Sequence, residues 1–117
     1  MKKKILLADD DKDELKLISA LLRNRGYEIE VSENGEDFEK KSLDQFDVFL
    51  LDINMKGIFG TDICKRLKSH DNTKNKPVIL ISAALDLRTR ANSCGADDYI
   101  SKPFEGSELI HTIEQHL

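Results

Sequence analysis

The sequence predicts an open α/β sandwich, a doubly wound five-stranded parallel sheet with five helices on its two faces. Unbroken apolar runs at residues 5–8, 48–51 and 78–81 are typical of strands that are buried on both faces. Segments with apolar residues at helical spacing alternate with these runs, as in parallel α/β folds. The length of 117 residues suits one domain, 1–117, with its own core.

The five expected strands occur at intervals along the chain. Residues 5–8 form the first, and residues 27–32 alternate strictly, as in a shorter strand that is exposed on one face. Three further strands are expected at 46–52, 78–82 and 97–101, with a loop over 70–77.

The five expected helices follow these strands. Gly26 is placed to close the first and Gly95 to stop the fourth. The second, over 34–45, is polar enough to be weak and mostly solvated. The apolar stripes of the other four helices are Leu15, Ile18 and Leu22; Ile63, Cys64 and Leu67 in the helix at 60–70; Leu87, Ala91 and Cys94; and Ile110, Ile113 and Leu117.

Composition and charge exclude several functional classes. A net charge of −4 argues against a nucleic-acid surface, because phosphate binding depends on clustered Lys and Arg. The apolar segment after the first lysines is too short for a signal peptide or a membrane span, so we expect no membrane contact and a cytoplasmic location. Cys64 and Cys94 lack metal-site spacing and are interpreted as small buried side chains.

Acidic residues follow two of the apolar strands directly. Asp9 and Asp10 come after the first strand and Asp52 ends the third, while Ser82 ends the fourth. Because the carboxyl ends of parallel strands share one edge of a sheet, these groups are expected to converge there. Carboxylates held together in this way suit a hard divalent cation, and Mg²⁺ fits one or two direct carboxylates plus waters and a phosphate oxygen.

The same cluster suits phosphoryl transfer. With a metal in place, a carboxylate can attack phosphorus and form an acyl phosphate. Asp52 is the better candidate nucleophile because it ends a strongly apolar strand, while Asp9 and Asp10 are neighbours suited to sharing the metal. Lys102 and the Ser82 hydroxyl are candidates for contacting the phosphoryl group.

Together these residues resemble the response-regulator receiver domain of two-component signalling, and the resemblance covers the whole chain. It rests on five separated pieces in the same order. These are the acidic pair Asp9 and Asp10, Asp52 in "LLDINM", Ser82 in "ILISA", Tyr99 in "DDYI", and "KPF" at residues 102–104.

The resemblance implies a flavodoxin-like fold with strand order 2-1-3-4-5, and a phosphorelay function. Asp52 would accept phosphate from a phosphohistidine on a sensor histidine kinase or histidine phosphotransfer protein. Mg²⁺ would be held by Asp10, Asp52 and the backbone carbonyl of Asn54, with Asp9 acting through a water, and Lys102 would contact the phosphate.

The same resemblance implies a switch. Ser82 would move to bind the phosphate and Tyr99 would turn inward behind it, altering the face formed by helix four, strand five and helix five. A downstream protein target would dock on this face. The chain would act on itself and would not turn over a free substrate.

Two positions depart from the family's pattern. Lys56 stands where the family commonly has Pro, and Phe59 where it often has Asp. Lys56 restores a backbone donor and removes a fixed φ. For Phe59 we favour packing onto the following helix over an exposed contact.

Other polar residues receive structural interpretations. Asp11 occupies a helix N-cap position. Asp97 and Asp98 are expected to be solvated turn residues, and His70, His111 and His116 to be surface residues with no metal-ligand spacing.

Two other functional classes remain open from sequence. A pseudo-receiver would use the same fold as an interaction module without phosphate, although such a module is expected to lack part of the acidic and lysine set. A phosphohydrolase of the haloacid-dehalogenase type also uses a strand-terminal Asp with Mg²⁺, but it usually has a second carboxylate where this chain has Asn54.

Overall fold

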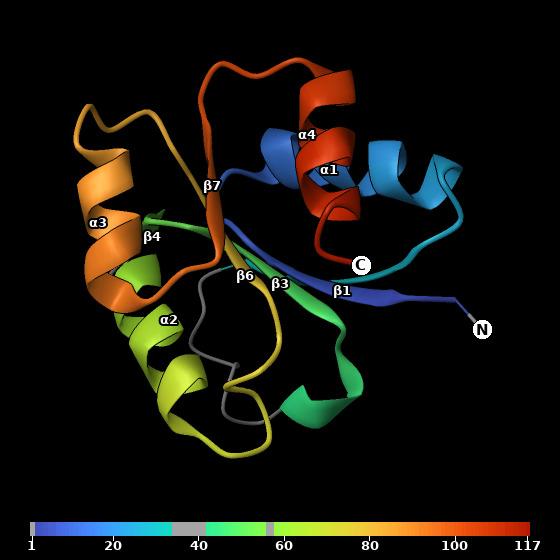
Figure 1. Cartoon of the computed structure of the whole chain (residues 1–117). Helices are drawn as coiled ribbons and strands as arrows, with labels where there is room; N and C mark the ends of the chain where they lie inside the picture. Colours follow the sequence, from blue (N-terminus) through green and yellow to red (C-terminus); the bar gives the residue numbers. More distant parts are fainter. Residues whose placement is uncertain (1, 34–41, 56–57) are drawn as a thin grey trace.

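A computed structural model describes residues 2–33, 42–55 and 58–117 (Figure 1). Its main sheet is parallel throughout, with strand order β2-β1-β3-β6-β7, which confirms the predicted fold class and strand order. The strands of this sheet are β1 (Lys4–Ala8), β2 (Glu28–Ser32), β3 (Val48–Asp52), β6 (Val78–Ser82) and β7 (Asp98–Ser101).

Four α-helices occur in the described residues, and they cover both faces of the sheet (Figure 1). One face carries α1 (Lys12–Asn24) and α4 (Gly106–Glu114), which contact each other. The opposite face carries α2 (Gly60–Ser69) and α3 (Leu87–Cys94). Among the residues that the structure describes, no helix is both long enough and apolar enough to cross a bilayer.

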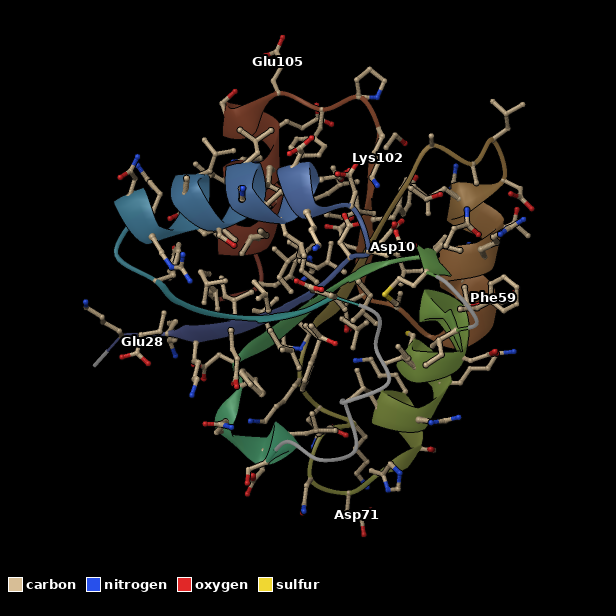
Figure 2. The ribbon with its side chains drawn as sticks, turned by 180° about the vertical axis from the view of Figure 1, so that it is seen from behind. Asp10, Glu28, Phe59, Asp71, Lys102 and Glu105 are labelled. Carbon is tan, nitrogen blue, oxygen red and sulfur yellow. The ribbon has the colours of Figure 1, made fainter. Side chains whose placement is uncertain are left out.

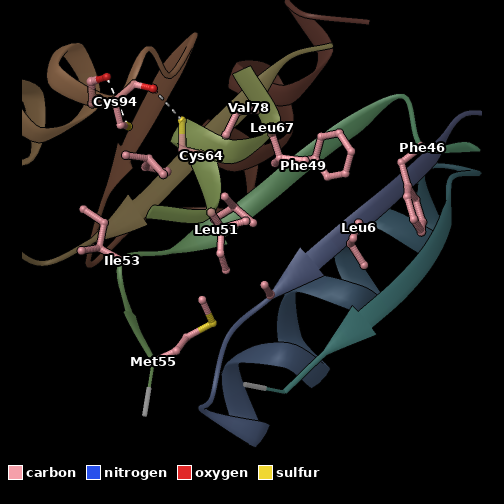
Figure 3. Close-up of a cluster of buried hydrophobic side chains, with 14 of the residues drawn as sticks. Leu6, Phe46, Phe49, Leu51, Ile53, Met55, Cys64, Leu67, Val78 and Cys94 are labelled. Carbon is pink, nitrogen blue, oxygen red and sulfur yellow. Dashed lines mark hydrogen bonds between the residues drawn. The ribbon is translucent and has the colours of Figure 1, made fainter. Parts of the chain in front are cut away.

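The central strands separate two apolar layers because successive side chains point to opposite faces. On the α2/α3 side, Leu6, Phe49 and Leu80 belong to one fully buried cluster, part of which is drawn in Figure 3. On the α1/α4 side, Leu7 and Leu50 belong to the other. Every residue of β3 and β6 is buried, as the continuous apolar runs predict.

Three of the predicted helix stripes are confirmed, since all their residues are buried. The last helix differs: Leu109 and Ile113 are buried, Ile110 is half-buried, and Leu117 lies beyond α4 with 37% of its surface exposed. Ile113 is therefore confirmed as a core residue, while Leu109 takes the buried place predicted for Ile110.

The glycine helix stops are confirmed in position. Gly95 is the C-cap of α3 with φ +80°, and Gly26 follows the C-cap of α1 with φ +92°. Both conformations are in the left-handed region that glycine adopts readily.

Two further expectations need adjustment. The predicted helix over 34–45 falls mostly outside the described residues, and its described end is a single 3₁₀ turn, η2 (Leu43–Gln45). In β2, Ile29 packs against the core but Val31 is 39% exposed, because β2 is an edge strand.

A small antiparallel hairpin follows β3 and was not predicted. It pairs β4 (Asn54–Met55) with β5 (Ile58–Phe59), with Asn54 opposite Phe59 and Met55 opposite Ile58. The hairpin leads directly into α2, so it fixes the chain immediately after Asp52.

Candidate functional site

The carboxylate cluster forms at the carboxyl ends of two adjacent strands. Ala8 of β1 lies in register with Leu51 of β3, which brings Asp9 beside Asp52. Asp9, Asp10 and Asp52 each offer a carboxylate oxygen, and these three oxygens all lie within 4.8 Å of one another. Figure 2 shows Asp10 and Lys102 at the end of the sheet opposite Asp71. The predicted convergence of the three carboxylates is thus found in the structure.

Lys102 brings one positive charge to this cluster. Its Nζ lies 3.5 Å from Asp52 Oδ1 and 3.8 Å from Asp9 Oδ2, and its nearest carboxylate oxygen is Glu14 Oε1 at 3.0 Å. The backbone N–H of Lys102 donates to the Ser82 carbonyl oxygen at 2.9 Å, which ties the segment after β7 to the end of β6. The lysine is therefore held in place both by the sheet and by carboxylates.

Burial makes the site electrostatically unusual. Asp9 is 1% exposed and Asp52 is 7% exposed, whereas Asp10 is open to solvent. Burial raises the pKa of Asp9 from its ordinary value of 3.8 to about 6, and the charge of Asp52 adds to the rise. Burial also raises the pKa of Asp52, although the charge of Lys102 opposes that rise.

Lys102 stays cationic in this setting. Burial lowers its pKa, but the close ion pair with Glu14 and the charges of Asp52 and Asp9 outweigh burial and raise the pKa above the ordinary value. The site therefore combines one firmly protonated lysine with carboxylates that are costly to ionise together.

The carboxylates fit a divalent metal ion. Asp9 Oδ1 accepts the backbone N–H of Asp11 at 3.0 Å, but Asp9 Oδ2 is buried and accepts no hydrogen bond within the described part of the chain. A buried carboxylate oxygen without a hydrogen bond is costly unless a cation compensates. Three oxygen donors so close together match the preference of Mg²⁺ for hard oxygen ligands.

Ser82 ends the neighbouring strand β6, and Tyr99 lies earlier in β7, opposite Leu80. Ser82 is 2% exposed, and its Oγ accepts the backbone N–H of Ala84 at 3.0 Å. The half-buried Tyr99 packs against the core cluster on the α2/α3 side. The structure thus brings Asp9, Asp10, Asp52 and Lys102 into one cluster, with these two side chains on its β6–β7 side.

The hairpin after β3 supports Asp52. The backbone N–H of Asn54 favours the ionised form of Asp52 and opposes the rise in its pKa, and Asn54 itself is exposed. Phe59, opposite Asn54, is 56% exposed, so the expectation that it packs onto α2 is wrong. Its ring instead borders a hollow of about 400 Å³ between α2 and α3. Lys56 lies outside the described residues.

The structural roles predicted for Asp11, His70 and His111 are confirmed. Asp11 is the N-cap of α1 and its Oδ1 accepts from the backbone N–H groups of Asp13 and Glu14, as predicted. His70 and His111 are exposed, as expected.

The Asp97 and Asp98 expectations are wrong in detail. The exposed Asp97 accepts from the Val78 backbone N–H at 2.8 Å and from Lys68 Nζ at 2.5 Å, so it joins elements instead of only meeting solvent. Asp98 lies within β7, and its Oδ2 is 2.9 Å from Nε2 of the half-buried His116.

Glu14 is the site residue that the sequence interpretation did not identify. It lies four residues after Asp10, in the first turn of α1, and its side chain is 16% exposed. Burial raises its pKa, while the adjacent Lys102 ammonium group lowers it. The spacing of four residues from the acidic pair is the only signal in the sequence, and it is shared by many helix-surface glutamates.

The family model for the response regulator receiver domain matches residues 5–114. The chain belongs to the response regulator receiver family. This assignment confirms the resemblance seen in the sequence, and it identifies the chain as a signalling domain of the kind found in two-component response regulators.

The receiver is similar to named regulators from several bacteria. It is 38% identical to the nisin biosynthesis regulatory protein NisR of Lactococcus lactis, over 97% of this chain and 50% of the relative. It is also 38% identical to the transcriptional regulatory protein CpxR of Escherichia coli, over 97% of this chain and 49% of the relative. The chain therefore spans about half the length of these curated relatives.

Solved receivers share the fold over almost the whole chain. The chemotaxis protein CheY4 of Vibrio cholerae superposes with a TM-score of 0.90, with 26% identity and full coverage of both chains. The response regulator protein TrrA of Thermotoga maritima, solved in complex with Mg²⁺-BeF, gives a TM-score of 0.87 with 34% identity, over 98% of this chain and 99% of that one. A related receiver therefore holds Mg²⁺, in agreement with the carboxylate cluster found here.

Proposed function

We propose that this chain, as one domain over residues 1–117, is a phosphoryl-accepting receiver in which Asp52 is the acceptor. The donor is the phosphohistidine of a sensor histidine kinase or a histidine phosphotransfer protein in the cytoplasm. One observation carries the proposal: three carboxylates have oxygens within 4.8 Å of one another, and Lys102 Nζ lies 3.5 Å from Asp52. This arrangement combines a metal-binding oxygen cluster, a nucleophilic carboxylate and a cation.

In the proposed reaction an Asp52 carboxylate oxygen attacks phosphorus. The new O–P bond forms as the P–N bond to the donor imidazole breaks, and the imidazole nitrogen keeps the electron pair. Lys102 stabilises the charge on the phosphoryl oxygens. Hydrolysis of the acyl phosphate later returns Asp52 and inorganic phosphate.

Mg²⁺ would be held by Asp10, Asp52 and the backbone carbonyl of Asn54, with Asp9 acting through a water. When bound, the ion supplies positive charge to the phosphoryl oxygens and offsets the repulsion among the carboxylates. Asp9 Oδ2 accepts no hydrogen bond within the described residues, which supports this assignment, because a metal-bound water offers it a donor.

The response is a change of binding surface. We propose that Ser82 leaves its bond with the Ala84 N–H to contact the phosphoryl group, and that half-buried Tyr99 turns inward behind it. Both residues adjoin the face formed by α3, β7 and α4, where a downstream protein target would dock. The net charge of −4 argues against direct nucleic-acid binding by this domain.

The decisive experiment is phosphorylation by a small donor. The protein is incubated with acetyl phosphate with and without Mg²⁺, and its intact mass is followed beside Asp52→Asn. Asp71→Asn is a matched control, because it makes the same change at an exposed residue at the other end of the sheet.

We expect a Mg²⁺-dependent gain of one phosphoryl group in the parent protein and in the Asp71 variant, and none in the Asp52 variant. Absence of any gain, together with failure to bind beryllofluoride and Mg²⁺, would contradict the proposal and favour a pseudo-receiver that works without phosphate. Turnover of added phosphoesters would instead indicate a phosphohydrolase.

A further inference from the structure

Glu14 is the nearest anion to the ammonium group of Lys102. The Nζ–Oε1 distance is 3.0 Å, against 3.5 Å to Asp52 and 3.8 Å to Asp9. Both side chains are largely buried, with 21% of Lys102 and 16% of Glu14 exposed. An ion pair shielded from water in this way is stronger than an exposed one, so it influences where the ammonium group lies.

The local structure fixes Glu14 in this place. The Asp11 side chain caps α1 and accepts the Glu14 backbone N–H at 3.2 Å, so the first turn of the helix is held against the acidic strand end. Lys102 is fixed at its backbone by the bond to Ser82. The two side chains thus meet from separately anchored elements.

Glu14 Oε1 is buried and, within the described residues, has no hydrogen bond of good geometry. Its electrostatic partner at close range is the Lys102 ammonium group. Lys102 in turn is the one cation that ion-pairs with Asp9 and Asp52 in the described structure. A phosphoryl group on Asp52 would therefore compete with Glu14 for the Lys102 ammonium group.

We propose that Glu14 is a positioning residue that holds Lys102 back from Asp52 and competes with the phosphoryl group for it. The proposal rests on the proposed function of Asp52 as acceptor. Glu14 then favours the unphosphorylated state, and phosphorylation shifts the ammonium group from α1 toward β3.

The test compares Glu14→Gln and Glu14→Asp with the parent protein. Gln removes the charge and keeps the shape, while Asp keeps the charge but falls short of the ammonium group by one methylene. Asp13→Asn is the matched control, since it removes a carboxylate from the same turn of α1 at an exposed position.

Two quantities are measured at saturating Mg²⁺: the affinity for beryllofluoride, a stable phosphoryl mimic, by NMR titration, and the rate of phosphorylation by acetyl phosphate. We expect both Glu14 variants to bind beryllofluoride about fivefold more tightly and to be phosphorylated faster by a similar factor, with no change in Asp13→Asn. The amide spectra recorded in the same titration check that each variant is folded.

Other outcomes would overturn the proposal. Weaker beryllofluoride binding by Glu14→Gln would mean that Glu14 aligns Lys102 instead of restraining it. A gain in Glu14→Gln but none in Glu14→Asp would assign the effect to charge at a distance, and no change in either would remove the role altogether. Failure of the parent protein itself to bind beryllofluoride would instead count against the proposed function of Asp52.

Discussion

Asp9 shows how one buried side chain links the metal site to stability. Its pKa is raised from 3.8 to about 6, chiefly by burial, so the folded protein holds this proton more tightly than the unfolded chain does. The proton on Asp9 therefore stabilises the folded protein. This stabilisation is fully present below pH 3.8 and is lost as the pH rises through 6. Without metal, an ionised Asp9 therefore destabilises the protein at neutral pH.

We predict that Asp9→Asn stabilises the metal-free protein at pH 7.5 by about 1–3 kcal/mol, because the amide does not ionise. The advantage should shrink as the pH falls to 4. Urea unfolding in EDTA at several pH values measures this, with exposed Asp13→Asn as the control. A difference that does not vary with pH would contradict the prediction.

At the scale of elements, the turn from β3 into α2 depends on Gly60. Its backbone N–H donates to the Ile53 carbonyl oxygen at 2.8 Å, and a Cβ on Gly60 would overlap the backbone carbonyl of Asp52. The start of α2 therefore packs directly on β3, the strand that ends in Asp52, the proposed phosphoryl acceptor.

Gly60→Ala is predicted to destabilise the protein by about 1–3 kcal/mol, because backbone atoms must shift to admit the methyl group. It should also slow phosphorylation of Asp52. Gly106→Ala is the matched control, since its nearest neighbour is the flexible end of Leu21 at 3.2 Å. Thermal unfolding of the two variants decides the point, and equal stability would show that the turn adapts at little cost.

The main strands and helices were predictable because the spacing of apolar residues in the sequence matches the pattern of buried side chains in the structure. Val48–Leu51 and Val78–Ile81 are fully buried, and continuous apolar runs predict that directly. The β4–β5 hairpin was not predictable, because strands of two residues carry no periodic signal. In the last helix Ile113 was predictable, but the burial of Leu109 instead of Ile110 was not, since both are apolar and only packing decides which faces the core.

The acidic site was predictable for a similar reason. Asp9 and Asp52 follow apolar strands, and parallel topology brings such positions together. Glu14 was not, because its contact with Lys102 joins α1 to the segment after β7 across most of the chain. A spacing within one helix gives no information about such a long-range contact.

At the scale of the whole molecule, the carboxylates concentrate negative charge at one end of the sheet. Within the described residues Lys102 pairs with Asp9, Glu14 and Asp52, and Asp10 lies beside Asp9 and Asp52, so several carboxylates must be accommodated together there. A cation that binds only the folded protein stabilises it by mass action. The free energy of unfolding of the whole domain should therefore rise when Mg²⁺ binds.

We predict that Mg²⁺ at about 100 times its dissociation constant raises the unfolding midpoint by on the order of 10 °C. The rise should be reversed by EDTA, absent in Asp10→Asn, and smaller below pH 6, where a proton on Asp9 opposes the ion. Differential scanning calorimetry measures it, with NaCl at equal ionic strength as the control. An equal rise in Asp10→Asn would place the ion elsewhere.

The pairing of Asn54 with Phe59 has a practical consequence. The chain contains no tryptophan, so an indole introduced at position 59 would be its sole source of tryptophan emission. That indole would be partly open to solvent and would lie directly across the hairpin from Asn54. Occupation of the acidic site and approach of another molecule to the α2–α3 hollow would each alter its emission colour and intensity. Position 59 of this receiver is thus a suitable place for an intrinsic fluorescent reporter near the acidic site.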